Sequence, residues 1–301
     1  MPAVPGTDTR NALMMAKSLP CRAAVLSAVA VTLVCGRAMA QDQTPAVAAV
    51  AAECKVQSEI AHFELPLTNL AHRLSIGKPI RIVAIGSSST AGFGASSPGA
   101  TYPSRLEAEL REHFPGHALT VVNRGVYSEE LPNMIARFDT AVIAERPHLV
   151  IWQFGTNALM YDRPLSPGLV AAGVARLKSV GADVVLMDPQ YAPRVLAKPA
   201  RDELIARMAE AAKEYKVDLL HRYDIMRHWH EVDGLPFETF VTRDGLHLND
   251  WGYACVAKSL GVAIAEATAR ATHNVTMPGK ASRLASLRHA TRRAVRVLRA
   301  P

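Results

Sequence analysis

Cysteine is scarce in this chain, which has only four cysteines among 301 residues and no Cys-x-x-Cys pair. Cysteine and histidine residues also do not occur at the spacing that is typical of a metal site. His228-Trp-His230 offers two histidines, but the sequence supplies no clear third ligand for them. The sequence therefore predicts no metal centre, and nothing in it indicates another cofactor.

Long apolar runs are also missing after the first forty residues, where no segment is apolar and long enough for a transmembrane helix. Near the start, basic residues precede an apolar run from Ala23 to Val34, and Ala38-Met-Ala40 follows as a small-x-small cleavage site. This pattern predicts a signal peptide over residues 1–40 and a mature protein that is soluble in the periplasm or secreted. An uncleaved amphipathic arm is the alternative.

Removal of residues 1–40 would take away Cys21 and Cys35 and leave Cys54 and Cys255. Because the periplasm and the exterior are oxidising, these two are candidates for a disulfide. Two separate buried thiols are the alternative.

Acidic residues are absent between Gly279 and Pro301, a stretch that holds seven basic ones. These equal the whole formal net charge of +7, so the rest of the chain is balanced and predicts no nucleic-acid partner. The basic tail, residues 271–301, could lie as a helix on an anionic membrane surface. A solvated tail is the alternative, and the oligomeric state is left open.

The segment Ile80–Gly86 is a run of mostly apolar residues that ends at a glycine and is followed by Ser87, Ser88 and Ser89. Such a run predicts a buried parallel strand, whose carboxyl end is where open α/β folds bind ligands. A serine in this turn could be an exposed nucleophile near the amides of the next helix. Taken alone, the turn favours a plain loop or helix cap.

A possible partner lies 150 residues further on, in Asp244-Gly-Leu-His247. A serine hydroxyl needs an adjacent base, and that base needs a group that fixes its tautomer. An Asp and a His three residues apart can meet on one turn and fill both roles. The tetrapeptide alone favours a loop aspartate and an unrelated surface histidine, and only together with the serine turn does it indicate a base and its partner.

Two further predicted strands end in residues that could stabilise an oxyanion. One ends in Asn123, Arg124 and Gly125, and the other ends in Gly155, Thr156 and Asn157. A glycine amide and an asparagine side chain are suitable donors to the developing charge of an ester-hydrolysis intermediate.

With these four blocks in this order, over roughly residues 78–267, the chain resembles the SGNH (GDSL-type) hydrolases. The resemblance assigns the nucleophile to Ser88, the acid and base to Asp244 and His247, and the oxyanion hole to Gly125, Asn157 and the Ser88 amide. It implies no metal or other cofactor.

The chain departs from that family at two positions. Ser87 stands where the family has an aspartate before the nucleophile, and Ala158 stands where an aspartate often follows the asparagine. These departures leave open which serine of the turn is the nucleophile. The Gly-x-Ser-x-Gly elbow is absent because position 90 is Thr, which argues against the α/β-hydrolase fold.

Strand-like and helix-like segments alternate through a predicted domain over residues 78–270, after an N-terminal arm over residues 41–77. This alternation predicts an α/β fold: a three-layer α/β/α sandwich with a five-stranded, mainly parallel sheet, flavodoxin-like in type. The predicted strands begin near Ile80, Leu119, His148, Ala182 and Val217, and the predicted helices span about Tyr102–Phe114, Leu131–Glu145, Leu169–Val180, Arg201–Tyr215 and Tyr253–Ala269.

A few polar and aromatic residues have two plausible roles. Trp152 is expected in the core, and Gln153 as a buried, hydrogen-bonded group behind the site. Trp229 would pack locally or line the pocket rim. Asp188-Pro-Gln190 would contact substrate or form an ordinary turn after the strand.

The resemblance implies an exported serine esterase that forms an acyl-enzyme on Ser88, with small or carbohydrate-linked esters as expected substrates. A lipase, a lysophospholipase and an acyltransferase of the same family are alternatives. A protein of another class, which binds the cell envelope without catalysis, is a further alternative, although it would not need the complete Ser, Gly, Asn, Asp and His set.

Overall fold

The computed structural model describes residues 53–276. The predicted signal peptide (residues 1–40) and the basic tail from residue 277 lie outside the described residues. The predicted N-terminal arm is described from residue 53.

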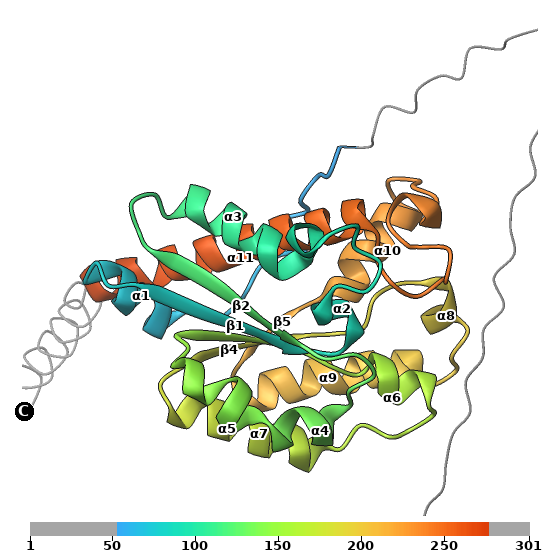
Figure 1. Cartoon of the computed structure of the whole chain (residues 1–301), viewed down its shortest axis with the longest axis horizontal. Helices are drawn as coiled ribbons and strands as arrows, with labels where there is room; N and C mark the ends of the chain where they lie inside the picture. Colours follow the sequence, from blue (N-terminus) through green and yellow to red (C-terminus); the bar gives the residue numbers. More distant parts are fainter. Residues whose placement is uncertain (1–52, 277–301) are drawn as a thin grey trace, which may run out of the picture. The chain divides into compact units, whose positions relative to one another are not determined.

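A five-stranded parallel sheet forms the centre of the described part of the chain (Figure 1). The strands lie in the order β2-β1-β3-β4-β5. The first strand, β1, has β2 on one side, and β3, β4 and β5 follow on the other side, so the strand order reverses between β1 and β3. In sheets of this order, ligands bind at the carboxyl ends of the strands, beside that reversal. The strands are β1 (Ile80–Gly86), β2 (Leu119–Gly125), β3 (Leu149–Gln153), β4 (Asp183–Met187) and β5 (Asp218–Leu220).

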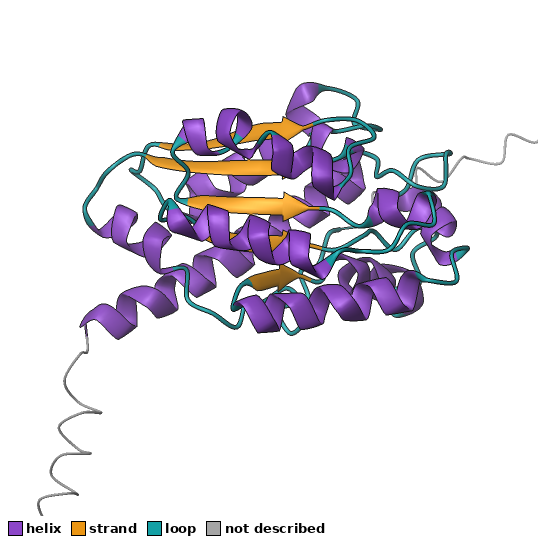
Figure 2. Cartoon of the chain, turned by 90° about the horizontal axis from the view of Figure 1, so that it is seen from below, coloured by secondary structure: helices purple, strands orange, loops and turns teal. Residues whose placement is uncertain are grey.

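Helices cover both faces of the sheet, which gives the three layers that the sequence predicts (Figure 2). Helices α1, α3 and α11 pack together on one face, and α4, α7 and α9 pack together on the other. The helices are α1 (Thr68–Ser75), α2 (Ser88–Ala91), α3 (Tyr102–His113), α4 (Leu131–Ala136), α5 (Phe138–Ala141), α6 (Thr156–Met160), α7 (Pro167–Ser179), α8 (Pro193–Leu196), α9 (Arg201–Tyr215), α10 (Arg222–Glu231) and α11 (Asp250–Thr276), with short 3-10 turns η1 (Pro98–Ala100), η2 (Ile143–Glu145) and η3 (Phe237–Thr239). None of the helices described between residues 53 and 276 has the length and apolarity needed to cross a membrane.

Burial follows the sheet. The side chains of β3 are all buried, and those of β1 are buried except at Arg81, because helices cover both faces of these central strands. Trp152 is fully buried, as predicted, and packs against Phe138 with ring centroids 5.0 Å apart.

The helix predicted from Leu131 to Glu145 is wrong as a continuous element. The structure has α4, α5 and η2 in its place, with breaks at Arg137 and Val142, where φ is −104° and −120°. Met134, Phe138 and Val142, spaced four residues apart, are all fully buried. The apolar face that the spacing predicts is therefore kept, although the helix is interrupted.

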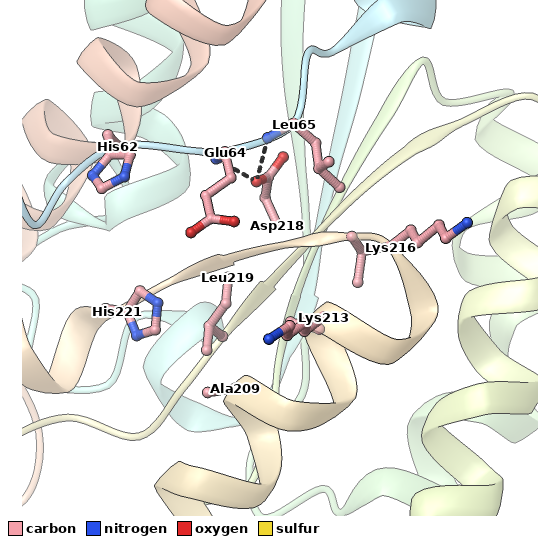
Figure 3. A pocket seen from close by; sticks show the side chains of 11 residues that line it. His62, Glu64, Leu65, Ala209, Lys213, Lys216, Asp218, Leu219 and His221 are labelled. Atoms are coloured by element: carbon pink, nitrogen blue, oxygen red, sulfur yellow. Dashed lines mark hydrogen bonds between the residues drawn. The ribbon is translucent and has the colours of Figure 1, made fainter.

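The N-terminal segment is fixed to the domain by a carboxylate on β5. The Asp218 carboxylate accepts hydrogen bonds from the amides of Glu64 and Leu65, at 2.8 and 3.1 Å (Figure 3). Phe63, which directly precedes Glu64, is 1% exposed and belongs to the core. The same segment carries Cys54, which forms a disulfide with Cys255.

This disulfide joins residues 201 positions apart, with Cα atoms 5.5 Å from each other. Closing so long a loop would stabilise the fold by up to about 5 kcal/mol in the chain-entropy treatment. In a full chain with Cys21→Ser and Cys35→Ser, we expect no free thiol in denaturant without reductant and two after reduction. Two free thiols before reduction would contradict the pairing.

Candidate active site

The serine turn, residues 87–89, follows β1 directly and is fixed by hydrogen bonds to the Gln153 side chain. This fully buried side chain accepts hydrogen bonds through Oε1 from the Ser87 amide at 3.0 Å, the Ser87 hydroxyl at 3.1 Å and the Thr90 hydroxyl at 3.2 Å. Gly86 leaves room for this arrangement, since a Cβ there would lie 2.2 Å from Thr90 Oγ1. The expectation of a buried, hydrogen-bonded Gln153 behind the site is confirmed.

Among the three serines of the turn, Ser88 is the one that contacts the predicted base. Its Oγ lies 2.8 Å from Nε2 of His247. Ser87 and Ser89 are 2% and 1% exposed, whereas Ser88, the first residue of α2, is half-buried. The geometry therefore favours Ser88 over its neighbours as the nucleophile.

The other ring nitrogen of His247 contacts Asp244, with Nδ1 and Oδ2 2.5 Å apart. The second carboxylate oxygen, Oδ1, accepts hydrogen bonds from the Thr242 hydroxyl at 2.7 Å and from the amides of Leu246 and His247 at 2.8 and 2.9 Å. Partial burial acts to raise the pKa of Asp244, but these hydrogen bonds, that of the His247 side chain foremost, outweigh it and lower the pKa to about 2. Asp244 is thus ionised at neutral pH and can fix the orientation and tautomer of the ring.

The Asp188-Pro-Gln190 segment supports the histidine loop from inside the protein. Asp188 and Gln190 are fully buried, so they form the scaffold of the site and not its surface. Gln190 donates through Nε2 to the Leu246 carbonyl at 2.9 Å and accepts from the Thr156 hydroxyl at 2.9 Å and from Arg222 at 3.0 Å. One amide therefore connects the loop that carries His247 with the turn after β3. Burial raises the pKa of Asp188 to about 8, although the charge of Arg222 opposes this shift.

Gly125, the first predicted oxyanion donor, lies opposite Gly86 in the register of β1 and β2. A Cβ on Gly125 would lie 2.1 Å from the Ala91 nitrogen, so only glycine lets the end of β2 come this close to α2. Its N–H donates to Asn123 Oδ1 at 2.9 Å in this structure. The Asn123 side chain must therefore move aside before the Gly125 amide can bind an oxyanion.

Asn157, the second predicted donor, lies on α6 just after the turn at Gly155, where φ is +96°. One N–H of its side chain donates to the Glu129 carbonyl at 2.8 Å, which fixes the orientation of the amide group. The side chain is half-buried and carries a second N–H for an oxyanion.

Replacing Asn157 by alanine should lower kcat for an acetate ester by about 10²–10³-fold, the usual effect of losing one oxyanion donor. The thermal unfolding midpoint should change little, because the side chain is only half-buried. Asn133→Ala, on the exposed side of α4, is the matched control. An unchanged kcat would exclude Asn157 as an oxyanion donor and leave it only the structural hydrogen bond to the Glu129 carbonyl.

The proposed catalytic residues lie between an aromatic side chain and a cavity. The Phe93 ring lies 4.4 Å from the His247 ring, between centroids. A cavity of about 270 Å³ lies on the side of Asn157, and its lining includes Ser87, Glu129, Leu131, Phe154, Arg163 and Leu165. Sequence reasoning missed both features, because neither Phe93 nor this cavity belongs to a motif.

The remaining candidates lie elsewhere. Trp229 is fully buried on α10 against Phe240 and Trp251, so it packs locally and does not line a pocket rim. His230 Nδ1 lies 2.8 Å from the Leu235 carbonyl. Within residues 53–276, no three His, Cys, Asp or Glu side chains are grouped as they would be around a metal ion.

A second cavity, of about 360 Å³, lies along the edge strand β5, three strands from β1 in the sheet (Figure 3). His62, Glu64, Lys213 and His221 are among the residues that line it. Neither a serine nor any of the predicted site residues lines this cavity.

Several solved structures share this fold. A two-domain esterase active on acetylated mannans superposes with a TM-score of 0.59 at 18% identity, over 71% of this chain and 57% of that one, so the chain spans little more than half of that protein. A variant of an acetylxylan esterase from Geobacillus stearothermophilus gives a TM-score of 0.52 at 19% identity, over 62% of this chain and 94% of that one. A protein assigned to the G-D-S-L lipolytic family from Desulfitobacterium hafniense DCB-2 gives 0.51 at 22% identity, over 61% and 98%.

No curated protein sequence matches the chain. A family model, however, matches residues 53–270, which is most of the chain, and its description as non-GDSL fits the presence of Ser87 where GDSL-type enzymes have an aspartate. The predicted resemblance to the SGNH (GDSL-type) hydrolases is confirmed, and the chain belongs to the non-GDSL lipase-like family.

Proposed function

We propose that this protein hydrolyses carboxylic esters through a covalent acyl-enzyme on Ser88. The observation that carries the proposal is the continuous hydrogen-bond chain from Ser88 Oγ to His247 Nε2, 2.8 Å, and from His247 Nδ1 to Asp244 Oδ2, 2.5 Å. This chain of atoms is the arrangement that activates a serine for attack on a carbonyl. Family membership and the esterases among the structural neighbours support the same reaction class.

In the first half of the reaction, Ser88 Oγ attacks the ester carbonyl carbon while His247 Nε2 takes the hydroxyl proton. The tetrahedral oxyanion accepts hydrogen bonds from the Ser88 and Gly125 amides and from Asn157 Nδ2. When the carbon–oxygen bond to the alcohol breaks, His247 gives its proton to the departing oxygen. Asp244, being ionised, stabilises the imidazolium throughout.

In the second half, a water molecule attacks the acyl-serine carbonyl and gives a proton to His247. Collapse of the second tetrahedral intermediate releases the carboxylic acid and returns the proton to Ser88. The products are one acid and one alcohol, and the reaction needs no redox partner or metal. Transfer of the acyl group to another hydroxyl follows the same steps with an alcohol in place of water.

For the substrate class, we favour short acyl esters of carbohydrates over the lipid and lysophospholipid esters that the family also admits. The support comes from the neighbours, which are described as active on acetylated mannans and as an acetylxylan esterase. At 18–19% identity these neighbours show the shared fold, so the choice of substrate is part of the proposal.

The proposal places the protein in the periplasm or outside the cell. The charged leader, the apolar run and the Ala38-Met-Ala40 site support this location, and so does a disulfide, which persists in oxidising compartments. N-terminal sequencing of the protein from a periplasmic extract should begin at Gln41. A start at Met1 in that extract would contradict cleavage.

A chromogenic acetate ester tests the activity directly. The purified protein should release the chromophore with saturable kinetics, and a serine-reactive fluorophosphonate should abolish the release and label Ser88, as peptide mass spectrometry would show. The alternative is a protein that binds the envelope without catalysis. Such a protein would release no chromophore above the buffer rate and would take up no label.

A further inference from the structure

Two exposed aromatic rings stand beside the His247 side chain. Phe93 is 48% exposed and lies against the His247 ring, and Tyr127 is 58% exposed and meets Phe93 edge to face, with centroids 6.0 Å apart and planes at 82°. Val126, between Gly125 and Tyr127 in the chain, is also exposed. Large apolar side chains left in water next to reactive groups usually mark a binding surface.

The two rings come from loops that are tied to the nucleophile. The Phe93 amide donates to the Ser88 carbonyl at 2.9 Å, and the Phe93 carbonyl accepts from the Tyr253 hydroxyl at 2.7 Å. On the other loop, the Val126 amide donates to the Gly86 carbonyl at 3.0 Å. The backbone on both sides of the corner is therefore anchored before any substrate arrives, and the Phe93 ring also packs on His247. Such preorganisation reduces the entropy cost of binding.

The position of the rings determines which part of an ester they would contact. His247 must lie within hydrogen-bond distance of the departing alcohol oxygen in order to protonate it. Phe93 packs on that same ring, so it flanks the alcohol part of the substrate. The carbonyl oxygen of the ester is directed toward Asn157, on whose side the cavity lies, and not toward the two rings.

We infer that Phe93 and Tyr127 form a subsite for the alcohol part of the ester, and that its occupant is a sugar ring lying with its C–H face on the aromatic surface. This inference rests on the proposed esterase function and specifies its substrate class. Two half-exposed rings at nearly a right angle make an open corner. A sugar can cover such a corner with one face while its hydroxyl groups stay in water. An alkyl chain would gain from an enclosed groove, which an open corner does not provide.

The test keeps the acyl group constant and varies the alcohol. The substrates are ethyl acetate, a monoacetylated methyl pyranoside and octyl acetate, and kcat/KM is measured for each. Tyr127→Ala should lower the ratio of the pyranoside value to the ethyl value by about tenfold, mainly through KM, and Tyr127→Trp should restore it. Because both values come from one preparation, the ratio does not depend on how much of the variant is folded.

Tyr161→Ala is the matched control, since Tyr161 is a comparably exposed tyrosine, 52%, at the C-terminal end of α6, where its ring contacts the guanidinium of Arg163. It should leave the ratio unchanged. The inference is overturned if Tyr127→Ala leaves the pyranoside ratio unchanged, or if the octyl ratio falls in its place. Failure of the wild-type protein to hydrolyse any of the three acetates would instead overturn the proposed function itself.

Discussion

Ser88→Ala should lower kcat for an activated acetate ester by about 10⁴–10⁶-fold and leave the fold intact. The variant loses the one oxygen that lies 2.8 Å from His247 Nε2 and that would form the acyl bond. The side chain is half-buried at the start of α2, so its removal leaves no large cavity. Initial rates at saturating ester, with circular dichroism spectra of the same samples, would measure both effects.

The neighbouring serines are matched controls for this prediction. Ser89→Ala should retain substantial activity, because its buried hydroxyl has no hydrogen-bond partner among the described residues. Ser87→Ala should also remain active, although it loses the hydroxyl contact to Gln153, because the Ser87 amide still donates to the same oxygen. Near-normal turnover by Ser88→Ala would show that Ser88 is not the nucleophile. Loss of turnover in Ser87→Ala alone would assign that role to Ser87.

His247→Ala should be nearly as damaging as the loss of Ser88, because the serine then has no base and the leaving alcohol has no acid. The members of one triad act as a unit, so Ser88→Ala/His247→Ala should be hardly slower than either single variant. Asp244→Asn should lose less, since the introduced amide keeps one oxygen for the loop N–H groups while losing the charge that stabilises the imidazolium.

His228→Ala is the control for the histidine. His228 lies on α10, and its Nε2 is 3.7 Å from an oxygen of Asp233, so its nearest acidic group is not Asp244. Its removal should leave kcat close to the wild-type value. An inactive His228→Ala together with an active His247→Ala would transfer the role of base to α10.

The parts of the fold that could be predicted are those that carry a local signal. The apolar run Ile80–Gly86 and the periodic segment Arg201–Tyr215 have the bounds of β1 and α9. Asp244 and His247 could be paired from sequence because three residues of separation bring them onto one turn. Each of these features is encoded by residues that lie close together in the sequence, so a short sequence pattern is enough to predict it.

Other features depend on contacts between distant segments, which a local pattern does not contain. The Gln190 amide joins the turn after β3 to the histidine loop, across 34 and 56 residues of sequence. Asp218 fixes the N-terminal segment across more than 150 residues. Phe93 and Tyr127 meet only because β1 and β2 pair in parallel register, and two exposed aromatics on loops have no periodicity that would identify them.

The separation of Ser88 and His247 by 159 residues has a consequence for biosynthesis. The nucleophile leaves the ribosome early, whereas its base lies in the last loop before α11. A nascent chain therefore cannot hydrolyse an ester until all five strands of the sheet have been made. Contacts of such long range also slow folding. Recovery of esterase activity during refolding should therefore lag behind recovery of helical circular dichroism.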